Sequence, residues 1–123
     1  MRRIGFVAEL LSRNGVIAIT AAISPYRDTR ARARTLVDRW VEIYMNTPLS
    51  VCEARDPKGL YRRARHELQE GRSMHLTGVD DPYEPPLRAD LVLSGVDVRP
   101  EDNATRLVAY LEARKLLPGF TAE

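Results

Sequence analysis

The feature of this sequence that most constrains its fold is the unbroken apolar run VIAITAAI at residues 16–23, which is rich in β-branched side chains. Such a run is typical of a strand buried on both faces, as in a parallel sheet covered by helices. Two further strands are predicted, at residues 41–45, where apolar residues alternate, and at residues 91–93. A strand buried on both faces needs neighbours on both sides, and two others are too few to cover it.

Five helices are predicted around these strands. The first starts at the beginning of the chain without a capping residue and ends at Asn14-Gly15, which tolerate a left-handed backbone. The others follow capping or proline signals near Asp28 and at Thr47-Pro48, Asp56-Pro57 and Pro100. Strands that alternate with helices in this order predict an α/β fold, a parallel sheet flanked by helices. The uncapped first helix and the thin sheet suggest that the architecture is incomplete.

Length and composition exclude several classes of protein. The 123 residues suit a single domain over residues 1–123, and 44% hydrophobic with 29% charged residues is an ordinary globular balance. A net charge of +2, with few aromatic residues among the cations, argues against nucleic-acid binding. No segment is long enough to cross a membrane and no signal peptide is recognised, so a cytoplasmic location is expected.

A row of cations precedes a long polar loop at residues 71–87. Lys58, Arg62 and Arg65 are spaced to share one helix face, and Arg55 extends it if the break at Pro57 is mild. These side chains could clamp a phosphate or sulfate. A solvated basic face balanced by nearby glutamates is the interpretation that the pattern alone favours, and the anion clamp is the alternative.

Nucleophile and metal chemistry have weaker support. Ser24 follows the predicted strand, but no histidine or carboxylate stands at the spacing of a nucleophilic motif, so a turn residue is the simpler interpretation. His66 and His75 have no further ligand nearby, and Cys52 is the only cysteine, so no metal site is predicted.

Five blocks of the sequence carry a resemblance to one family. In order along the chain they are RRIGFVAELL (2–11), ISPYR (23–27), CEARDPKGLYRRAR (52–65), TGVDDPYEPP (77–86) and ADLVL (89–93). They are spread over residues 2–93, most of the length of the chain, and the pairing of RDPKGLY with TGVDDPYEPP is highly specific. On these blocks the chain resembles the adenylylsulfate kinases.

The resemblance implies a P-loop kinase fold and transfer of the ATP γ-phosphoryl group, with Mg²⁺, to the 3′-hydroxyl of adenosine 5′-phosphosulfate in sulfate assimilation. It implies that residues 71–87 form a lid over the substrate, with Arg62 and Arg63 at its base. The implied residues divide by ligand. The substrate side would be Ile23, Ser24, Pro25, Leu76, Thr77 and Gly78, and the ATP side Arg55, Lys58 and Arg62. Ser24, as a possible phosphoserine, and Lys58 would be the catalytic candidates.

The chain departs from the family pattern at three points. Leu76 stands where the family has a phenylalanine that stacks on the substrate adenine, and the segment between Arg65 and Thr77 is long and lacks an expected lysine. The N-terminal strand and the Gly-Lys-Ser/Thr phosphate-binding loop do not occur in the sequence, so the ligands for Mg²⁺ are absent as well. We therefore expect an incomplete P-loop kinase fold.

Three hypotheses remain open at this point. The chain is part of a kinase whose upstream half lies outside this sequence, or a non-catalytic remnant or binding subunit, or a P-loop kinase for another nucleotide. In the first two cases, we expect a homodimer or a complementing N-terminal part, and no catalysis by the chain alone.

Overall fold

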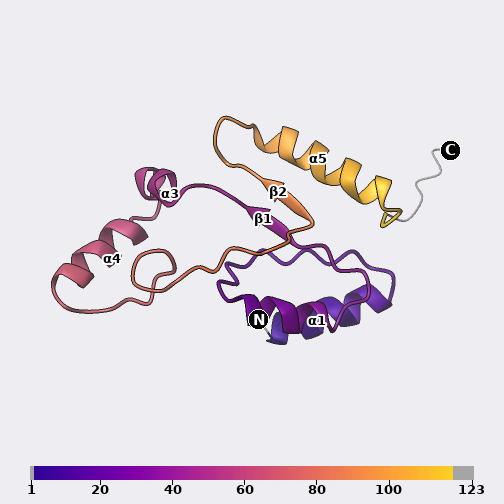
Figure 1. Cartoon of the computed structure of the whole chain (residues 1–123), viewed down its shortest axis with the longest axis horizontal. Coiled ribbons are helices and arrows are strands. Elements are labelled where there is room, and N and C mark those ends of the chain that lie inside the picture. The colour runs from indigo at the N-terminus through magenta and orange to yellow at the C-terminus, as the bar shows by residue number, and fades with distance from the viewer. Residues whose placement is uncertain (1, 118–123) are drawn as a thin grey trace.

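The computed structural model describes residues 2–117, which form five helices and two strands (Figure 1). The elements are α1 Arg2–Arg13, α2 Arg27–Arg34, β1 Ile43–Met45, α3 Leu49–Arg55, α4 Leu60–Gln69, β2 Leu91–Leu93 and α5 Pro100–Ala113. The predicted α/β order is confirmed. None of the helices in this part of the chain is long and apolar enough to cross a membrane. The predicted start of the first helix at Met1 lies outside the described residues.

The two strands form a parallel sheet in which Ile43 lies opposite Leu91 and Met45 opposite Leu93. The pairing continues past the strands, because the Asn46 amide donates to the Leu93 carbonyl across 2.7 Å. The connection from β1 to β2 passes through α3, α4 and the loop at residues 71–87 (Figure 1). The last two predicted strands and their parallel direction are therefore confirmed, although the first of them is shorter than predicted.

The prediction of a buried strand at residues 16–23 is wrong for this structure. The segment has no strand assignment, and Ile19 and Ile23 are 86% and 64% exposed. A strand requires a neighbour whose backbone groups pair with its own. Among the described residues, β1 and β2 pair only with each other, so the apolar segment runs unpaired. Its composition suits a buried strand, but the structure provides nothing to bury it.

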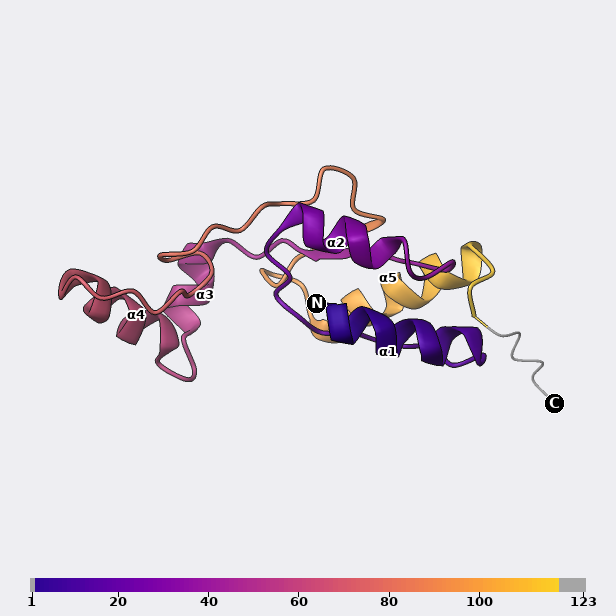
Figure 2. The ribbon, with the colours of Figure 1, turned by 90° about the horizontal axis from the view of Figure 1, so that it is seen from below.

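The helices α1 and α2 pack through small residues (Figure 2). Gly5 and Ala8 are the buried residues of α1, and Ala33 of α2 is 4% exposed. A Cβ placed on Gly5 would lie 3.6 Å from the Ala33 Cβ, so the helices approach closely at this point. Among the described residues, the buried hydrophobic ones are Ala8, Ala33, Ala64 and Leu93. The core is therefore thin, and most large apolar side chains remain partly exposed.

The helix α4 begins later than predicted, at Leu60 instead of the Asp56-Pro57 signal. The Asp56 carboxylate accepts hydrogen bonds from the amides of Tyr61 at 3.2 Å and Arg62 at 3.0 Å, so it caps the helix from a distance. Gly59, with a φ of 65°, provides the left-handed residue that this turn needs. The backbone amide of Arg62, followed by those of Tyr61 and Leu60, lowers the pKa of Asp56, although its partial burial opposes this.

Candidate functional site

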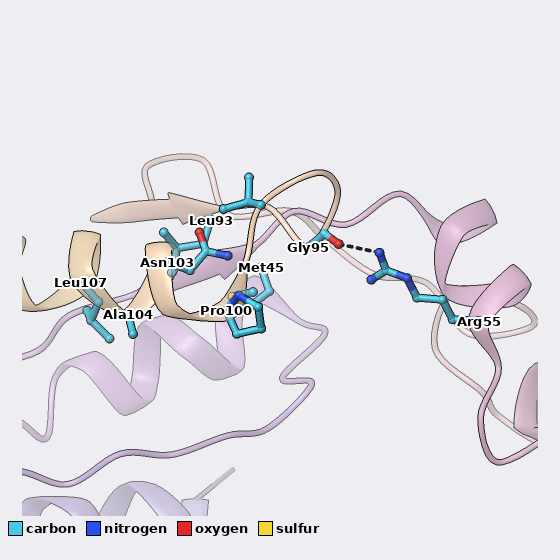
Figure 3. Close-up of a pocket in the computed structure, with 9 residues that line it drawn as sticks. Met45, Arg55, Leu93, Gly95, Pro100, Asn103, Ala104 and Leu107 are labelled. Carbon is cyan, nitrogen blue, oxygen red and sulfur yellow. Dashed lines mark hydrogen bonds between the residues drawn. The ribbon is translucent and has the colours of Figure 1, made fainter.

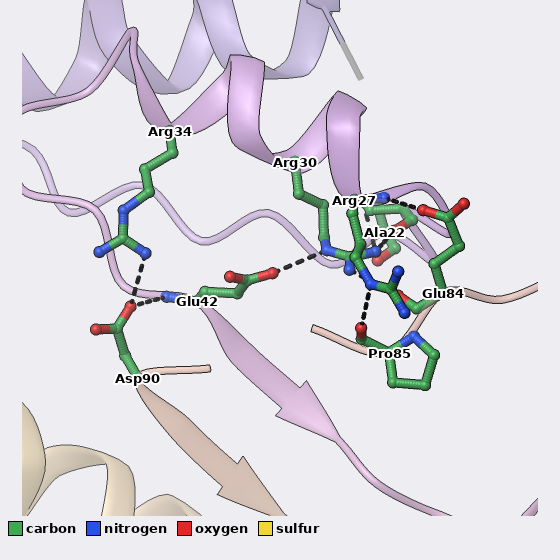
Figure 4. A network of polar contacts seen from close by, with 9 residues as sticks. Ala22, Arg27, Arg30, Arg34, Glu42, Glu84, Pro85 and Asp90 are labelled. Atoms are coloured by element: carbon green, nitrogen blue, oxygen red, sulfur yellow. Dashed lines mark hydrogen bonds and ion pairs between the residues drawn. The ribbon is translucent and has the colours of Figure 1, made fainter. Parts of the chain in front are cut away.

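The turn at residues 24–27 lies against the far end of the 71–87 loop (Figure 4). Ser24 has a φ of 45°, a left-handed backbone conformation that residues other than glycine rarely adopt. Its carbonyl accepts a hydrogen bond from Arg30 Nη1 at 2.6 Å, and the Pro25 carbonyl accepts one from the Glu84 amide at 2.9 Å. Ser24 and Pro25, both implied for the substrate side, are therefore held by Arg30 of α2 and by Glu84 of the 71–87 loop.

Arg30 is the centre of this region. It is only 8% exposed, and its guanidinium reaches three chain segments, donating to Glu42 Oε1 at 2.8 Å, the Ser24 carbonyl at 2.6 Å and the Glu84 carbonyl at 2.7 Å. It also lies 5.8 Å from the ring centroid of Tyr83. A buried charge is tolerated when it is paired and hydrogen-bonded, and Arg30 meets both conditions.

Further contacts join the same two segments (Figure 4). The Arg27 amide donates to Glu84 Oε2 at 2.7 Å, and Arg27 Nε donates to the Pro85 carbonyl at 2.8 Å. Tyr83 stacks on Tyr44 of β1, with ring centroids 6.0 Å apart and planes 12° from parallel. The carboxyl-terminal end of the loop is therefore fixed both to the turn and to the sheet.

The other end of the loop is organised by Asp80. Its Oδ2 accepts hydrogen bonds from Ser73 Oγ at 2.6 Å and from the amides of Met74 at 2.7 Å and His75 at 3.0 Å, while its Oδ1 accepts one from the Leu76 amide at 2.6 Å. The Ser73 hydroxyl, followed by the three amides, lowers the pKa of Asp80 to about 2, although its partial burial opposes this. One carboxylate thus closes the turn that presents Leu76.

The implied substrate residues do not form one contiguous group. Gly78 lies beside α3, because a Cβ placed on it would meet Leu49 Cδ1 at 3.0 Å. The Leu76 amide donates to Asp80 Oδ1 at 2.6 Å and the Gly78 amide to the Asp81 carbonyl at 2.7 Å, so these residues are held within their own loop. The two groups are connected through the chain that leads from Asp80 to Glu84. The open apolar segment ends at Ile23, which is exposed.

Arg55 lines a hollow of about 480 Å³ at the carboxyl ends of β1 and β2 (Figure 3). Its Nη2 donates to the Gly95 carbonyl at 2.7 Å, and the Gly95 amide donates to Thr47 Oγ1 at 3.1 Å. The remaining lining is mainly apolar and comes from β1, β2 and the start of α5. Ligands of open parallel sheets gather at this end of the strands, so Arg55 stands where a bound nucleotide base could be contacted.

The predicted cation row does not form a single clamp. Arg65 pairs with Glu53, with Nη2 and Oε1 2.5 Å apart, and the Arg62 side chain lies near the Asp56 carboxylate. Lys58 precedes α4 instead of standing on it, and no hydrogen bond or ion pair of its amino group occurs in the described part of the chain. Of the row, the Lys58 and Arg62 side chains make no hydrogen bond or ion pair within residues 2–117, so these two remain available to an added anion.

Acidic and imidazole side chains do not gather into a metal site. Within residues 2–117, no three His, Cys, Asp or Glu residues stand close enough to hold an ion. These residues do not fit a resident Mg²⁺, and we assign none of them to it.

Comparison with known proteins places these features in a family. The profile of the adenylylsulphate kinases matches residues 1–94. An adenylyl-sulfate kinase of Rippkaea orientalis is 48% identical over 112 residues, which are 91% of this chain and 60% of that protein. The chloroplastic adenylyl-sulfate kinase 1 of Arabidopsis thaliana is 45% identical over 120 residues, 95% of this chain and 42% of that protein.

The fold agrees with this result. The structure of the Mycobacterium tuberculosis APS kinase CysC in complex with AMPPNP and APS is similar, with a TM-score of 0.80 and 40% identity over 90% of this chain and 64% of that one. The chain therefore belongs to the adenylylsulfate kinase family. It spans less than two thirds of the length of these relatives.

Proposed function

We propose that this chain forms the substrate-side and lid portion of an enzyme that phosphorylates the 3′-hydroxyl of adenosine 5′-phosphosulfate. The observation that carries the proposal is the junction of the 24–27 turn with Glu84 and Pro85, because it joins two of the family blocks at one place. The match to the family over residues 1–94 and the similarity to a kinase crystallised with APS support it. In this proposal Ser24 and Pro25 contact the substrate, and residues 71–87 cover it.

The ATP side is assigned to Arg55, Lys58 and Arg62. Arg55 lines the hollow at the ends of the strands, where it would contact the ATP base, and the unengaged Lys58 amino group would contact its phosphates. Phosphoryl transfer also needs backbone amides and a hydroxyl around the phosphates, which a Gly-Lys-Ser/Thr loop supplies. The sequence of 123 residues contains no such loop. Mg²⁺ enters this proposal only as the ion that ATP carries.

A complementing polypeptide completes the site in this proposal. The apolar segment at residues 16–23 is exposed, with Ile17 at 53% and Ile19 at 86%, although its composition suits a strand buried on both faces. A strand supplied from outside residues 2–117 would pair with it and bury these side chains. The donor is either the N-terminal part of such a kinase or a second copy of this chain.

Two measurements test the proposed function. Calorimetric titration of the pure chain with adenylylsulfate is expected to show saturable binding that ordinary AMP competes for only weakly. A coupled assay for ATP-dependent phosphorylation is expected to show no turnover by the chain alone, and turnover when a protein containing a Gly-Lys-Ser/Thr loop of this family is added. If the pure chain does not bind adenylylsulfate and shows no turnover after the complementing protein is added, the assignment of the substrate side is contradicted. Turnover by the chain alone contradicts the need for a complement.

A further inference from the structure

We propose that Arg30 is a positioning residue, which holds the 24–27 turn and the carboxyl-terminal end of the 71–87 loop as one unit. This role is additional to the substrate and ATP contacts assigned above, and its use in the reaction rests on the proposed function. The three acceptors of Arg30 belong to three separate segments. They are the Ser24 carbonyl, the Glu84 carbonyl and the Glu42 carboxylate.

The geometry of the guanidinium explains why an arginine occupies this position. Its N–H groups form a rigid planar fork, so acceptors that it binds together are fixed relative to one another. Nη1 and Nη2 of Arg30 bind the Ser24 and Glu84 carbonyls at 2.6 and 2.7 Å, while Nε binds Glu42 at 2.8 Å. A lysine ammonium also has three donors, but they rotate freely on a compact charge and do not fix the acceptors in one plane.

Burial and charge strengthen the arrangement. The side chains of Arg30 and Glu42 are only 9% and 17% exposed, so little water competes for their contact. The face of Tyr83 lies 5.8 Å from the guanidinium, and Tyr83 in turn stacks on Tyr44 of β1. Arg30 therefore fixes the loop end to the sheet as well as to the turn.

The conformation of Ser24 requires such support. A left-handed φ of 45° at a serine is unfavourable, and it persists only where the surroundings impose it. The Arg30 contact at the Ser24 carbonyl and the Glu84 contact at the Pro25 carbonyl hold two successive peptide units, one on each side of Pro25. Loss of Arg30 is therefore expected to release the turn and the loop end together.

Hydrogen exchange of the full chain, followed residue by residue, tests this coupling. Two amides report on the two sides, since the Arg27 amide donates to Glu84 Oε2 and the Glu84 amide donates to the Pro25 carbonyl. In Arg30→Met both amides are expected to exchange about tenfold faster or more, because hydrogen bonds to a charged donor are lost. The amides of α4 are expected to keep their rates, since α4 makes none of these contacts.

Arg32→Met is the matched control. Arg32 lies on the same helix, its side chain is 79% exposed, and it pairs with Asp28 within that helix. The two reporter amides should keep their wild-type rates in this variant. An equal acceleration in Arg32→Met, or acceleration of only one reporter in Arg30→Met, overturns the proposal.

A second variant allows the test to be made even if Arg30→Met does not fold. If Arg30→Met unfolds because it leaves Glu42 buried without a partner, Arg30→Met/Glu42→Gln removes both charges. Faster exchange at both reporters with a wild-type circular dichroism spectrum supports the proposal, and unchanged exchange overturns it.

Adding adenylylsulfate separates the two proposals. Slower exchange at both reporters is expected in the wild type and in Arg32→Met, but not in Arg30→Met. No response in the wild type contradicts the proposed function, while the coupling by Arg30 is still decided by exchange without ligand.

Discussion

Tyr26 donates its hydroxyl hydrogen to Asp81 Oδ2 across 3.2 Å, although the two residues are 55 positions apart in the sequence. The negative charge of Asp81, followed by partial burial and this hydrogen bond, raises the pKa of the Tyr26 phenol. The contact continues the junction formed by Glu84 and Arg27 toward the middle of the 71–87 loop. The neighbouring aspartate, Asp80, instead serves the loop itself, so two adjacent carboxylates have different structural roles.

We predict that the turn closed by Asp80 opens in acid. The folded pKa of about 2 lies below the ordinary value of 3.8, so the ionised carboxylate stabilises the turn fully above pH 3.8. This contribution is lost as the pH falls from 3.8 toward 2. Amide chemical shifts of Met74, His75 and Leu76 should therefore stay constant between pH 7 and 5 and change as the pH falls through about 2, where the folded carboxylate takes up its proton.

Substitutions at pH 7 distinguish the role of the Asp80 carboxylate from a general effect of acid on the protein. Asp80→Asn should shift the same three amides at pH 7, because a neutral amide accepts hydrogen bonds more weakly. Asp81→Asn should leave these three amide shifts unchanged. It should instead weaken the hydrogen bond of the Tyr26 hydroxyl and lower the raised pKa of Tyr26. Wild-type shifts in Asp80→Asn would show that the turn does not depend on this carboxylate.

Local signals in the sequence predicted several elements correctly. Proline and the acidic residues after it mark the start of α5 at Pro100, and a short apolar run marks β2. The parallel pairing of β1 with β2 followed from the helices between them. The first two inferences use residues within one element or its immediate flanks, and the third uses only the order of the elements along the chain.

Features that depend on distant contacts were missed. The strand prediction at residues 16–23 failed because apolar composition does not supply the neighbour that a strand needs. Arg30 looked like one of several arginines on a helix, and only the fold brings Ser24, Glu42 and Glu84 around it. Its spacing carried no signal that could distinguish it from the exposed Arg32.

The contact between Gly95 and Thr47 gives a prediction on stability. A Cβ on Gly95 would lie 2.6 Å from Thr47 Oγ1, so Gly95→Ala must displace the threonine and break its hydrogen bond to the Gly95 amide. Urea unfolding should show that Gly95→Ala lowers the free energy of unfolding by about 1–3 kcal/mol. In a Thr47→Ala background the same substitution should cost less than about 1 kcal/mol, because the obstructing oxygen is gone. Equal costs in both backgrounds would contradict the close contact.

A further prediction on stability concerns the exposed segment at residues 16–23. Ile19→Thr should change the free energy of unfolding by less than about 0.5 kcal/mol, because the Ile19 side chain is already largely in water. Ala33→Thr should cost about 1–3 kcal/mol, because Ala33 is 4% exposed and packs against Gly5. Urea unfolding of both variants compares the two sites, and a large loss in Ile19→Thr would mean that the segment is buried in solution.

The same variant tests whether the segment binds another polypeptide. Sedimentation velocity should show association of the wild-type chain, with itself or with an added N-terminal part of a related kinase. Ile19→Thr should weaken that association, since less apolar surface is removed from water. Equal association of both proteins would place the contact surface elsewhere.

Leu76→Phe is predicted to tighten the binding of adenylylsulfate. The Leu76 amide is held by Asp80 Oδ1 at 2.6 Å, and a substitution of the side chain leaves this backbone contact intact. An aromatic face at this position can stack on the adenine, and such stacking contributes about 0.5–1.5 kcal/mol, or roughly two- to tenfold in affinity. Calorimetric titration of the wild type, Leu76→Phe and Leu76→Ala measures the effect. Leu76→Ala is the control for side-chain size and should bind no more tightly than the wild type. Equal affinities of the leucine and phenylalanine forms would mean that residue 76 does not face the substrate base, and the assignment of the 71–87 loop as its cover would have to be abandoned.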